Sequence, residues 1–214
     1  WICPFSRKIR ISLREKALDF KLVLENPWKR RHEFLVVNPA GSVPVLEEDG
    51  LIVIGTYAIT EYLEENHNKP DFLGQDAISR AEVRRLTEWF DIKFNKEVTQ
   101  LIITEKVIKR FSKSGDTDAA TIRCATQNIK HHLQYIEYLT DRRNWLAGDN
   151  FSYADISAAA HISCVDFFGD VAWDKFPAAR DWYSRIKSRP SMQIILKDKI
   201  AGLVAADHYG DLDF

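Results

Sequence analysis

The residues with the clearest capacity for chemistry lie at the start of the chain, in the run Cys3-Pro-Phe-Ser6. Proline suits the first turn of a helix, where its missing amide proton costs nothing, so Pro4 places Cys3 at the helix cap. The free amides and the dipole of a helix start favour a thiolate, which lowers the pKa of the thiol and makes the sulfur nucleophilic. Cys3 is therefore a candidate nucleophile that should titrate below an ordinary thiol, and Ser6 is a second candidate. The alternative is a small buried cysteine without chemistry.

The other cysteines and the histidines give no comparable pattern. Cys3, Cys124 and Cys164 are odd in number and far apart, which argues against a disulfide framework and fits a reducing cytosol. Cys124 and Cys164 lie within helical stripes and are expected to be inert core residues. No paired His and Cys spacing suits zinc, and His161 lies in an apolar stretch, where a satisfied core histidine is expected. The sequence therefore predicts no metal site.

Composition narrows the classes of function. The chain has 214 residues, with 30 Lys and Arg against 31 Asp and Glu, so no general electrostatic field attracts nucleic acid or an anionic membrane. No run is long and apolar enough to span a bilayer, and the first residues lack the pattern of a signal peptide. We therefore expect a cytoplasmic protein that neither binds nucleic acid nor inserts into a membrane.

The first third of the chain mixes helical and strand patterns, which predicts an α/β unit. Apolar residues at helical spacing predict a helix from Ser6 to Lys16. Short β-favouring runs predict strands at 20–24, 43–46 and 51–54, the last two joined by a tight turn. A further helix is expected at 56–65, with Thr56 as its cap.

The remaining elements should all be helices. Apolar residues at spacings of three and four predict amphipathic helices from about Ser79 to Ile102 and from Ile122 to Leu139. In Ser152-Tyr-Ala-Asp155 the hydroxyl and the carboxylate can each satisfy a free amide, which is the pattern of a capping box. The apolar stretch 156–165 that follows should be a central, buried helix. Another helix is expected at 177–189, ended by the proline that follows it.

These patterns divide the chain into two domains and a tail. Asn, Pro and Gly residues mark a linker at 67–75. We therefore expect an α/β domain at 1–66, with a first strand missing ahead of Trp1, and an all-helical domain at 76–204. The acidic tail at 205–214 need not join the core. It can be a disordered terminus or a docking peptide that orders on binding.

Three segments resemble the glutathione S-transferase superfamily. Asn38-Pro-Ala-Gly-Ser-Val-Pro-Val-Leu46 is similar to its glutathione-site loop. Trp145-Leu-Ala-Gly-Asp149, followed by Ser152-Tyr-Ala-Asp-Ile156, resembles its buried-helix capping motif, and Trp182-Tyr-Ser-Arg-Ile-Lys-Ser-Arg-Pro190 resembles its late helix. The segments occur in the family's order and spacing over nearly the whole chain. The resemblance implies a thioredoxin-like N-terminal domain, an all-α C-terminal domain, and a homodimer that pairs the first domain with the partner's second.

The resemblance also implies a glutathione site, although an altered one. Cys3 takes the position of the catalytic cysteine of omega-type transferases, with Ser6 as a hydroxyl that can bond to a thiolate. Val43, before an expected cis peptide to Pro44, would bind the cysteinyl backbone of glutathione. The alternative is a proline that merely starts a strand.

The other end of the expected glutathione site departs from the family. The family typically has Glu or Gln followed by Ser at positions 55 and 56, whereas this chain has Gly55 and Thr56. Thr56 keeps a hydroxyl and a helix-start amide for a carboxylate, and Tyr57 can compensate in part. The lost hydrogen bond can weaken glutathione binding by about one to two orders of magnitude.

Other residues favour partner binding over catalysis. The loop Trp28-Lys29-Arg30-Arg31 joins a large aromatic side chain to a basic cluster, which suits an interface, although short charged runs are usually only solvated. Four segments resemble the alphaproteobacterial FtsZ-localised protein A branch of the superfamily: residues 26–31, 143–148, 160–166 and the closing run that includes Asp211, Asp213 and Phe214. That branch is an adaptor for the division protein FtsZ.

Two functions therefore remain open. One is glutathione transfer or glutathione-dependent thiol chemistry on a small electrophile or disulfide, which Cys3 favours. The other is a catalytically silent adaptor that binds FtsZ, which Gly55, Trp28 and the tail favour.

Overall fold

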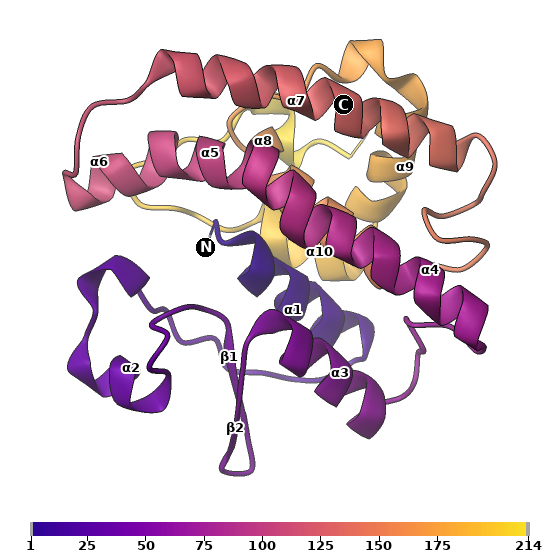
Figure 1. The fold of residues 1–214 in the computed structure, drawn as a ribbon, viewed down its shortest axis with the longest axis horizontal. Helices are drawn as coiled ribbons and strands as arrows, with labels where there is room; N and C mark the ends of the chain where they lie inside the picture. The colour runs from indigo at the N-terminus through magenta and orange to yellow at the C-terminus, as the bar shows by residue number, and fades with distance from the viewer. Residues whose placement is uncertain (1, 213–214) are drawn as a thin grey trace.

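The computed structural model describes residues 2–212 and shows a small α/β domain joined to a larger helical domain (Figure 1). Helix α1 lies between the two and packs on α3 of the first domain and on α8 and α10 of the second. The α/β domain contains these elements in chain order: α1 (Pro4–Glu15), η1 (Pro27–Lys29), α2 (His32–Val37), β1 (Val45–Glu48), β2 (Leu51–Ile54) and α3 (Thr56–Asn66). This arrangement confirms the predicted fold class.

The two strands form the expected hairpin. Val45 is opposite Ile54 and Glu48 is opposite Leu51, in an antiparallel pair. The turn between the strands places Asp49 and Gly50 at positive φ, as two-residue hairpin turns require. The hairpin leads directly into α3, and so fixes where the start of α3 lies.

The predicted strand at 20–24 does not form. Within residues 2–212 the sheet contains only β1 and β2, so the segment has no neighbouring strand to supply a hydrogen-bonded ladder. Leu22, Val23 and Leu24 are exposed instead of alternating between a core and a solvent face. A β-favouring composition is thus insufficient when no strand pairs with it.

The helical domain begins at a capping box in which Asp76 and Ser79 satisfy each other's backbone amides. The helical path from 77 to 112 includes two π-helical stretches, η2 and η3. Its elements are α4 (Ala77–Glu88), η2 (Trp89–Thr99), α5 (Gln100–Ile103), η3 (Thr104–Ile108), α6 (Lys109–Ser112), α7 (Ala119–Thr140), α8 (Tyr153–Asp166), η4 (Trp173–Lys175), α9 (Pro177–Lys187), α10 (Pro190–Leu196) and η5 (Asp207–Gly210). Pro190 begins α10 as well as following α9, because proline suits a first helical position.

Helix α8 is the centre of the core. All of its 14 residues are buried, as the apolar stretch predicted. The predicted capping box is present. The Ser152 side chain accepts a hydrogen bond from the backbone amide of Asp155, and the Asp155 side chain accepts one from the backbone amide of Ser152. The Asp155 carboxylate also accepts from the Leu146 amide at 3.0 Å and from the Trp182 indole at 2.9 Å. This carboxylate therefore ties three segments together.

The expectation that the tail need not join the core is wrong for residues 205–209, whereas Asp211 is exposed. Tyr209 is only 2% exposed and packs with Ile2, Val107, Cys164 and Phe167 in a second apolar cluster. A large ring gains more by filling this cluster than by remaining in water, and that gain offsets the entropy of ordering the segment.

No helix within residues 2–212 is long and apolar enough to cross a membrane.

Candidate functional site

Cys3 occupies the expected position at the start of α1. It is the N-cap residue, and Pro4 follows as the first helical residue. The Cys3 side chain makes no capping hydrogen bond to the helix amides. Its half-buried Sγ atom instead lies 4.0 Å from the carbonyl oxygen of Val43. The thiol is thus at the dipole's positive end but faces the neighbouring loop.

The Val43–Pro44 peptide bond is cis, as predicted. The loop that carries it is held by Asn38, whose side-chain amide donates to the Ser42 carbonyl at 2.7 Å and whose carboxamide oxygen accepts from the Ala40 amide. Folding therefore brings Cys3 beside a residue 40 positions later. This pairing of a thiol with the loop before a cis proline is the central geometry of the site.

The start of α3 differs from the expectation. Gly55, not Thr56, is the N-cap residue, and it has a φ of +91°. Thr56 is the first helical residue, and its carbonyl accepts a hydrogen bond from the Thr60 hydroxyl. The N-cap residue of α3 has a positive φ, which glycine adopts without a steric penalty, so Gly55 suits this position. A Cβ atom at Gly55 would meet nothing within 4 Å, so the missing side chain leaves open space.

A cavity of about 510 Å³ lies beside these residues, between α1, α3 and α4. Thr56, Tyr57 and Phe5 contribute to its wall, so it adjoins part of the predicted glutathione site. Tyr57 is 70% exposed, and its side chain is therefore available at the rim. Arg84 on α4 pairs with Glu61 on α3 at 3.0 Å, which closes one side of the cavity.

A charged pair that the sequence analysis missed connects the two domains at this cavity. The Lys8 ammonium of α1 lies 2.6 Å from the Asp91 carboxylate of η2, with the Lys8 side chain only 1% exposed. Burial raises the pKa of Asp91, but Lys8 and His161 outweigh that effect and bring the pKa to about 2. The apolar spacing of Ile9 and Leu13 did not include Lys8, and only the structure shows that α1 is buried all the way from Arg7 to Leu13, where a cation needs a partner.

His161 is buried on α8, as expected for a core histidine. Its Nδ1 lies 3.1 Å from the Thr99 hydroxyl, and Phe5 packs edge-on against its ring. Burial lowers the pKa of His161, so the ring is neutral at pH 7. These contacts indicate a structural role beneath the cavity.

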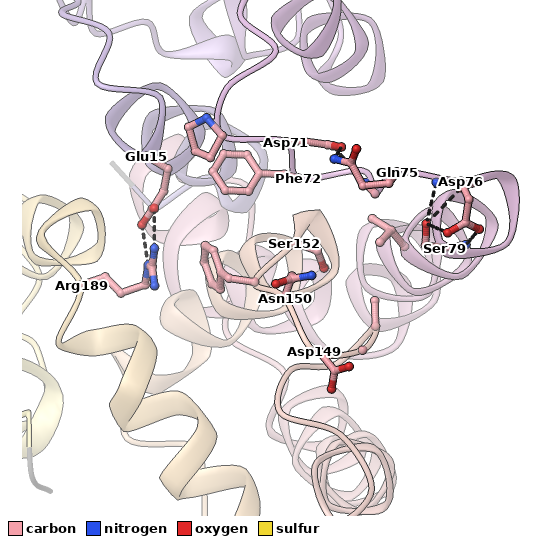
Figure 2. Close-up of a pocket in the computed structure, with 16 residues that line it drawn as sticks. Glu15, Asp71, Phe72, Gln75, Asp76, Ser79, Asp149, Asn150, Ser152 and Arg189 are labelled. Carbon is pink, nitrogen blue, oxygen red and sulfur yellow. Dashed lines mark hydrogen bonds and ion pairs between the residues drawn. The ribbon is translucent and has the colours of Figure 1, made fainter.

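A larger hollow of about 650 Å³ is lined by other residues and contains none of the predicted site residues (Figure 2). Several of its polar groups already have partners: Asp71 accepts from the amides of Leu73 and Gly74, and Arg189 pairs with Glu15 at 2.6 Å. The bonds to Asp71 hold the segment between α3 and α4, which forms part of the wall of the hollow.

The Trp28 loop lies on the surface. Trp28 is 42% exposed, and Lys29 and Arg30 are exposed beside it. Arg31 is tied down by Glu25 at 2.6 Å, and this hydrogen bond lowers the pKa of Glu25. The Arg31–Glu25 ion pair fixes one end of the loop. The Trp28 indole and the side chains of Lys29 and Arg30 are exposed together beside it.

The remaining predicted residues have mixed outcomes. Asp211 is exposed near the end of the described segment, whereas Asp213 and Phe214 lie outside the described residues.

The expectation that Cys124 is a core residue is wrong, because it lies beside, not on, the buried stripe of α7 and is exposed. Cys164 is buried, as predicted, and burial raises the pKa of its thiol to about 11. Among residues 2–212, no group of three or more His, Cys, Asp or Glu side chains could hold a metal ion.

Both domains match known families. The sequence model of the glutathione S-transferase N-terminal domain matches residues 2–71, and that of the glutathione S-transferase C-terminal domain matches residues 98–190. The fold, the cis proline loop and the α8 capping box agree with this assignment. The chain therefore belongs to the glutathione S-transferase family.

Three similar proteins define its neighbourhood in that family. FtsZ-localized protein A of Caulobacter vibrioides is 45% identical over 99% of this chain and 94% of its own length. The crystal structure of a glutathione S-transferase from Rhodospirillum rubrum F11 is 48% identical, with a TM-score of 0.97 over 100% of this chain and 96% of its own. The structure titled FzlA from C. crescentus is 44% identical, with a TM-score of 0.95 over 100% and 96% of the two chains.

Proposed function

We propose that this protein is a cytoplasmic, homodimeric adaptor with a glutathione S-transferase fold that binds the bacterial cell-division protein FtsZ. The observation that carries the proposal is the 45% identity to FtsZ-localized protein A over 99% of the chain. Gly55 supports it, because the position that would hold the ammonium group of glutathione has no side chain and open space around it. The adaptor role does not need that contact.

The Trp28 loop is the first candidate contact with FtsZ. Trp and Arg side chains supply much of the binding energy at protein interfaces, and Trp28 is exposed beside Lys29 and Arg30. The Trp28 ring can contact an apolar side chain, and the two cations can pair with acidic residues, so the loop suits an acidic segment of the partner that carries an apolar side chain. The tail, through Asp211 with Asp213 and Phe214 after it, is the second candidate contact.

Exposed apolar residues support the homodimer. Leu51 and Ile54 on β2 and Tyr57 on α3 are exposed on the first domain, and Ile92 is exposed on the second. In this family the first domain of one protomer pairs with the second domain of the other. Contact between these surfaces would remove the apolar side chains from water.

Glutathione-dependent thiol chemistry is the second candidate, and the placement of Cys3 beside Val43 favours it. In this reaction the Cys3 thiolate attacks the glutathione sulfur of a mixed disulfide and displaces the substrate thiolate. A glutathione thiolate then attacks the resulting Cys3–glutathione disulfide, which releases oxidised glutathione and restores the Cys3 thiolate. Val43, Thr56 and Tyr57 would position the tripeptide, with Ser6 near the sulfur.

Two measurements on the full chain separate the candidates. The first is calorimetric titration of reduced glutathione into the wild type and Cys3→Ala. The second is co-sedimentation with polymerised FtsZ for the wild type and Trp28→Ala, with Tyr138→Ala as a control because Tyr138 is an exposed aromatic residue on α7. We expect no glutathione heat at several millimolar, and FtsZ binding that Trp28→Ala weakens at least about tenfold. Glutathione binding that depends on Cys3, without FtsZ co-sedimentation, would overturn the adaptor.

A further inference from the structure

The segment after α10 returns to the end of α8 and is bonded there to one buried carboxylate. The His208 Nε2 atom lies 2.8 Å from Oδ1 of Asp166, and the Trp173 indole donates to the same oxygen at 2.7 Å. Asp166 is fully buried, although His208 and Asp166 are 42 positions apart. The Asp166 carboxylate thus accepts one hydrogen bond from the tail and a second from η4.

Three further contacts hold the same segment. The Ala206 amide donates to the Phe167 carbonyl at 2.9 Å. The Lys187 ammonium of α9 donates to the His208 carbonyl at 3.1 Å. Tyr209 fills the cluster that also contains Cys164 and Ile2. The segment is therefore bonded to α8 and α9 on both sides of His208.

Asp166 is an unfavourable residue for its place unless it has such partners. It is the last residue of α8, where the negative end of the helix dipole opposes a carboxylate, and it is removed from water. Charged groups in such places need donors that compensate the lost hydration. His208 and Trp173 supply donors to Oδ1, whereas Oδ2 is buried without a hydrogen-bond partner among the described residues. The carboxylate therefore depends on these two donors, and the tail is held by one of them.

We propose that the Asp166–His208 pair is the anchor that fixes residues 205–212 on the helical domain and so sets where Asp211 meets FtsZ. This inference rests on the proposed adaptor function. Asp211 lies three residues after His208, so loss of the anchor would loosen the part of the chain that leads to Asp211. A segment held in one conformation binds its partner without a new ordering cost.

The test compares His208→Ala with His208→Gln in the full chain. The glutamine amide keeps an N–H donor for Asp166, whereas alanine removes it. His131→Ala is the matched control, because His131 is an exposed histidine on α7. A variant that ends at residue 206 reports whether the tail contacts FtsZ at all. Amide hydrogen exchange of residues 205–210 measures anchoring, and FtsZ co-sedimentation measures binding.

We expect His208→Ala to speed exchange in the tail at least about tenfold, leave exchange in α8 unchanged, and weaken FtsZ binding about fivefold or more. His208→Gln should retain most of both properties, and His131→Ala should match the wild type.

Unchanged exchange in His208→Ala, or faster exchange with full FtsZ binding, would overturn the anchor. If truncation leaves FtsZ binding intact, the tail is not a contact and the anchor proposal fails, while the Trp28 loop can still carry the adaptor function. If the wild type does not bind FtsZ, the proposed function itself fails.

Discussion

At the scale of single residues, Gly55 and Cys3 favour different functions. Gly55 has positive φ and open space where the family places a hydrogen-bonding side chain. Cys3 nevertheless keeps the position of a reactive thiol, at a helix start and beside the loop before a cis proline. The two residues together predict a glutathione site that keeps its contact at the sulfur end and lacks one at the γ-glutamyl end.

Restoring the missing side chain tests this description. Gly55→Gln should strengthen glutathione binding about 10- to 100-fold, because one hydrogen bond to a charged group contributes about 1.5–3 kcal/mol. The positive φ at residue 55 should cost about 1–2 kcal/mol of unfolding free energy. Calorimetry and urea unfolding measure the two effects. Gly55→Ala is the control, since it carries the backbone cost without the amide, and equal affinities for the two variants would refute the account.

At the scale of elements, α8 depends on its first turn. Asp155 is fully buried and accepts from the backbone and side chain of Ser152, from the Leu146 amide and from the Trp182 indole. The capping box was visible as a local pattern, whereas the bonds to Leu146 and Trp182 depend on the packing of other segments around α8.

Removing the Asp155 carboxylate should strongly destabilise the folded protein. Asp155→Ala leaves buried donors unsatisfied and should lower the free energy of unfolding by about 3 kcal/mol or more. For a chain of this size that loss corresponds to a decrease of about 10 °C in Tm. Differential scanning calorimetry measures it, with Asp181→Ala on the exposed face of α9 as the control. A change below about 1 kcal/mol would show that the hydrogen bonds to Asp155 contribute little.

The C-terminal anchor should respond to pH in a defined direction. The hydrogen bond to Asp166 is the main reason that the pKa of His208 is raised; Asp207 adds to the effect, while burial and Lys187 oppose it. The stabilisation is therefore fully present below about pH 6.5, the unfolded value, and is lost as pH rises through the folded pKa. NMR titration of the His208 ring and the Tyr209 amide should show the tail loosening in that upper range. His208→Gln should remove this pH dependence, and its persistence there would exclude His208 as the cause.

At the scale of the whole molecule, buried charges and neutral histidines join the parts. The Lys8–Asp91 pair connects α1 to the helical domain, above the neutral His161. His132 of α7 accepts from the Trp89 indole at 3.1 Å and faces Glu97 at 3.0 Å through its other nitrogen. Burial lowers the pKa of His132 to about 4, so the ring through which α7 contacts η2 is neutral at pH 7.

Global stability should therefore fall in mild acid. The unfolded chain binds protons at His132 and His161 near pH 6.5, whereas the folded protein resists them, so stability decreases as pH falls from about 6.5 towards 4. The shift at His132 alone corresponds to about 3 kcal/mol below pH 4. Urea unfolding at several pH values measures the slope, and His132→Gln should reduce it. An unchanged slope in that variant would mean that other groups dominate the acid response.

The sequence alone determined the local features of this protein. The helical periods, the hairpin at β1 and β2, and the Ser152–Asp155 capping box were all readable, because each depends on neighbours a few positions apart. The cis bond before Pro44 was readable because its motif resembles a known family. For the candidate site, the sequence identified Cys3 and Val43, and the structure shows that they lie together.

Only the tertiary structure decided the features that depend on distant partners. The run 20–24 has strand-like residues but no strand beside it, and Cys124 lies just off a buried stripe whose orientation the packing sets. Lys8 meets Asp91, and His208 meets Asp166, across 83 and 42 positions of the chain. Periodicity shows that a side chain is buried without showing what it faces. The free energy of a buried charge or ring depends on that partner, and only folding brings the two together.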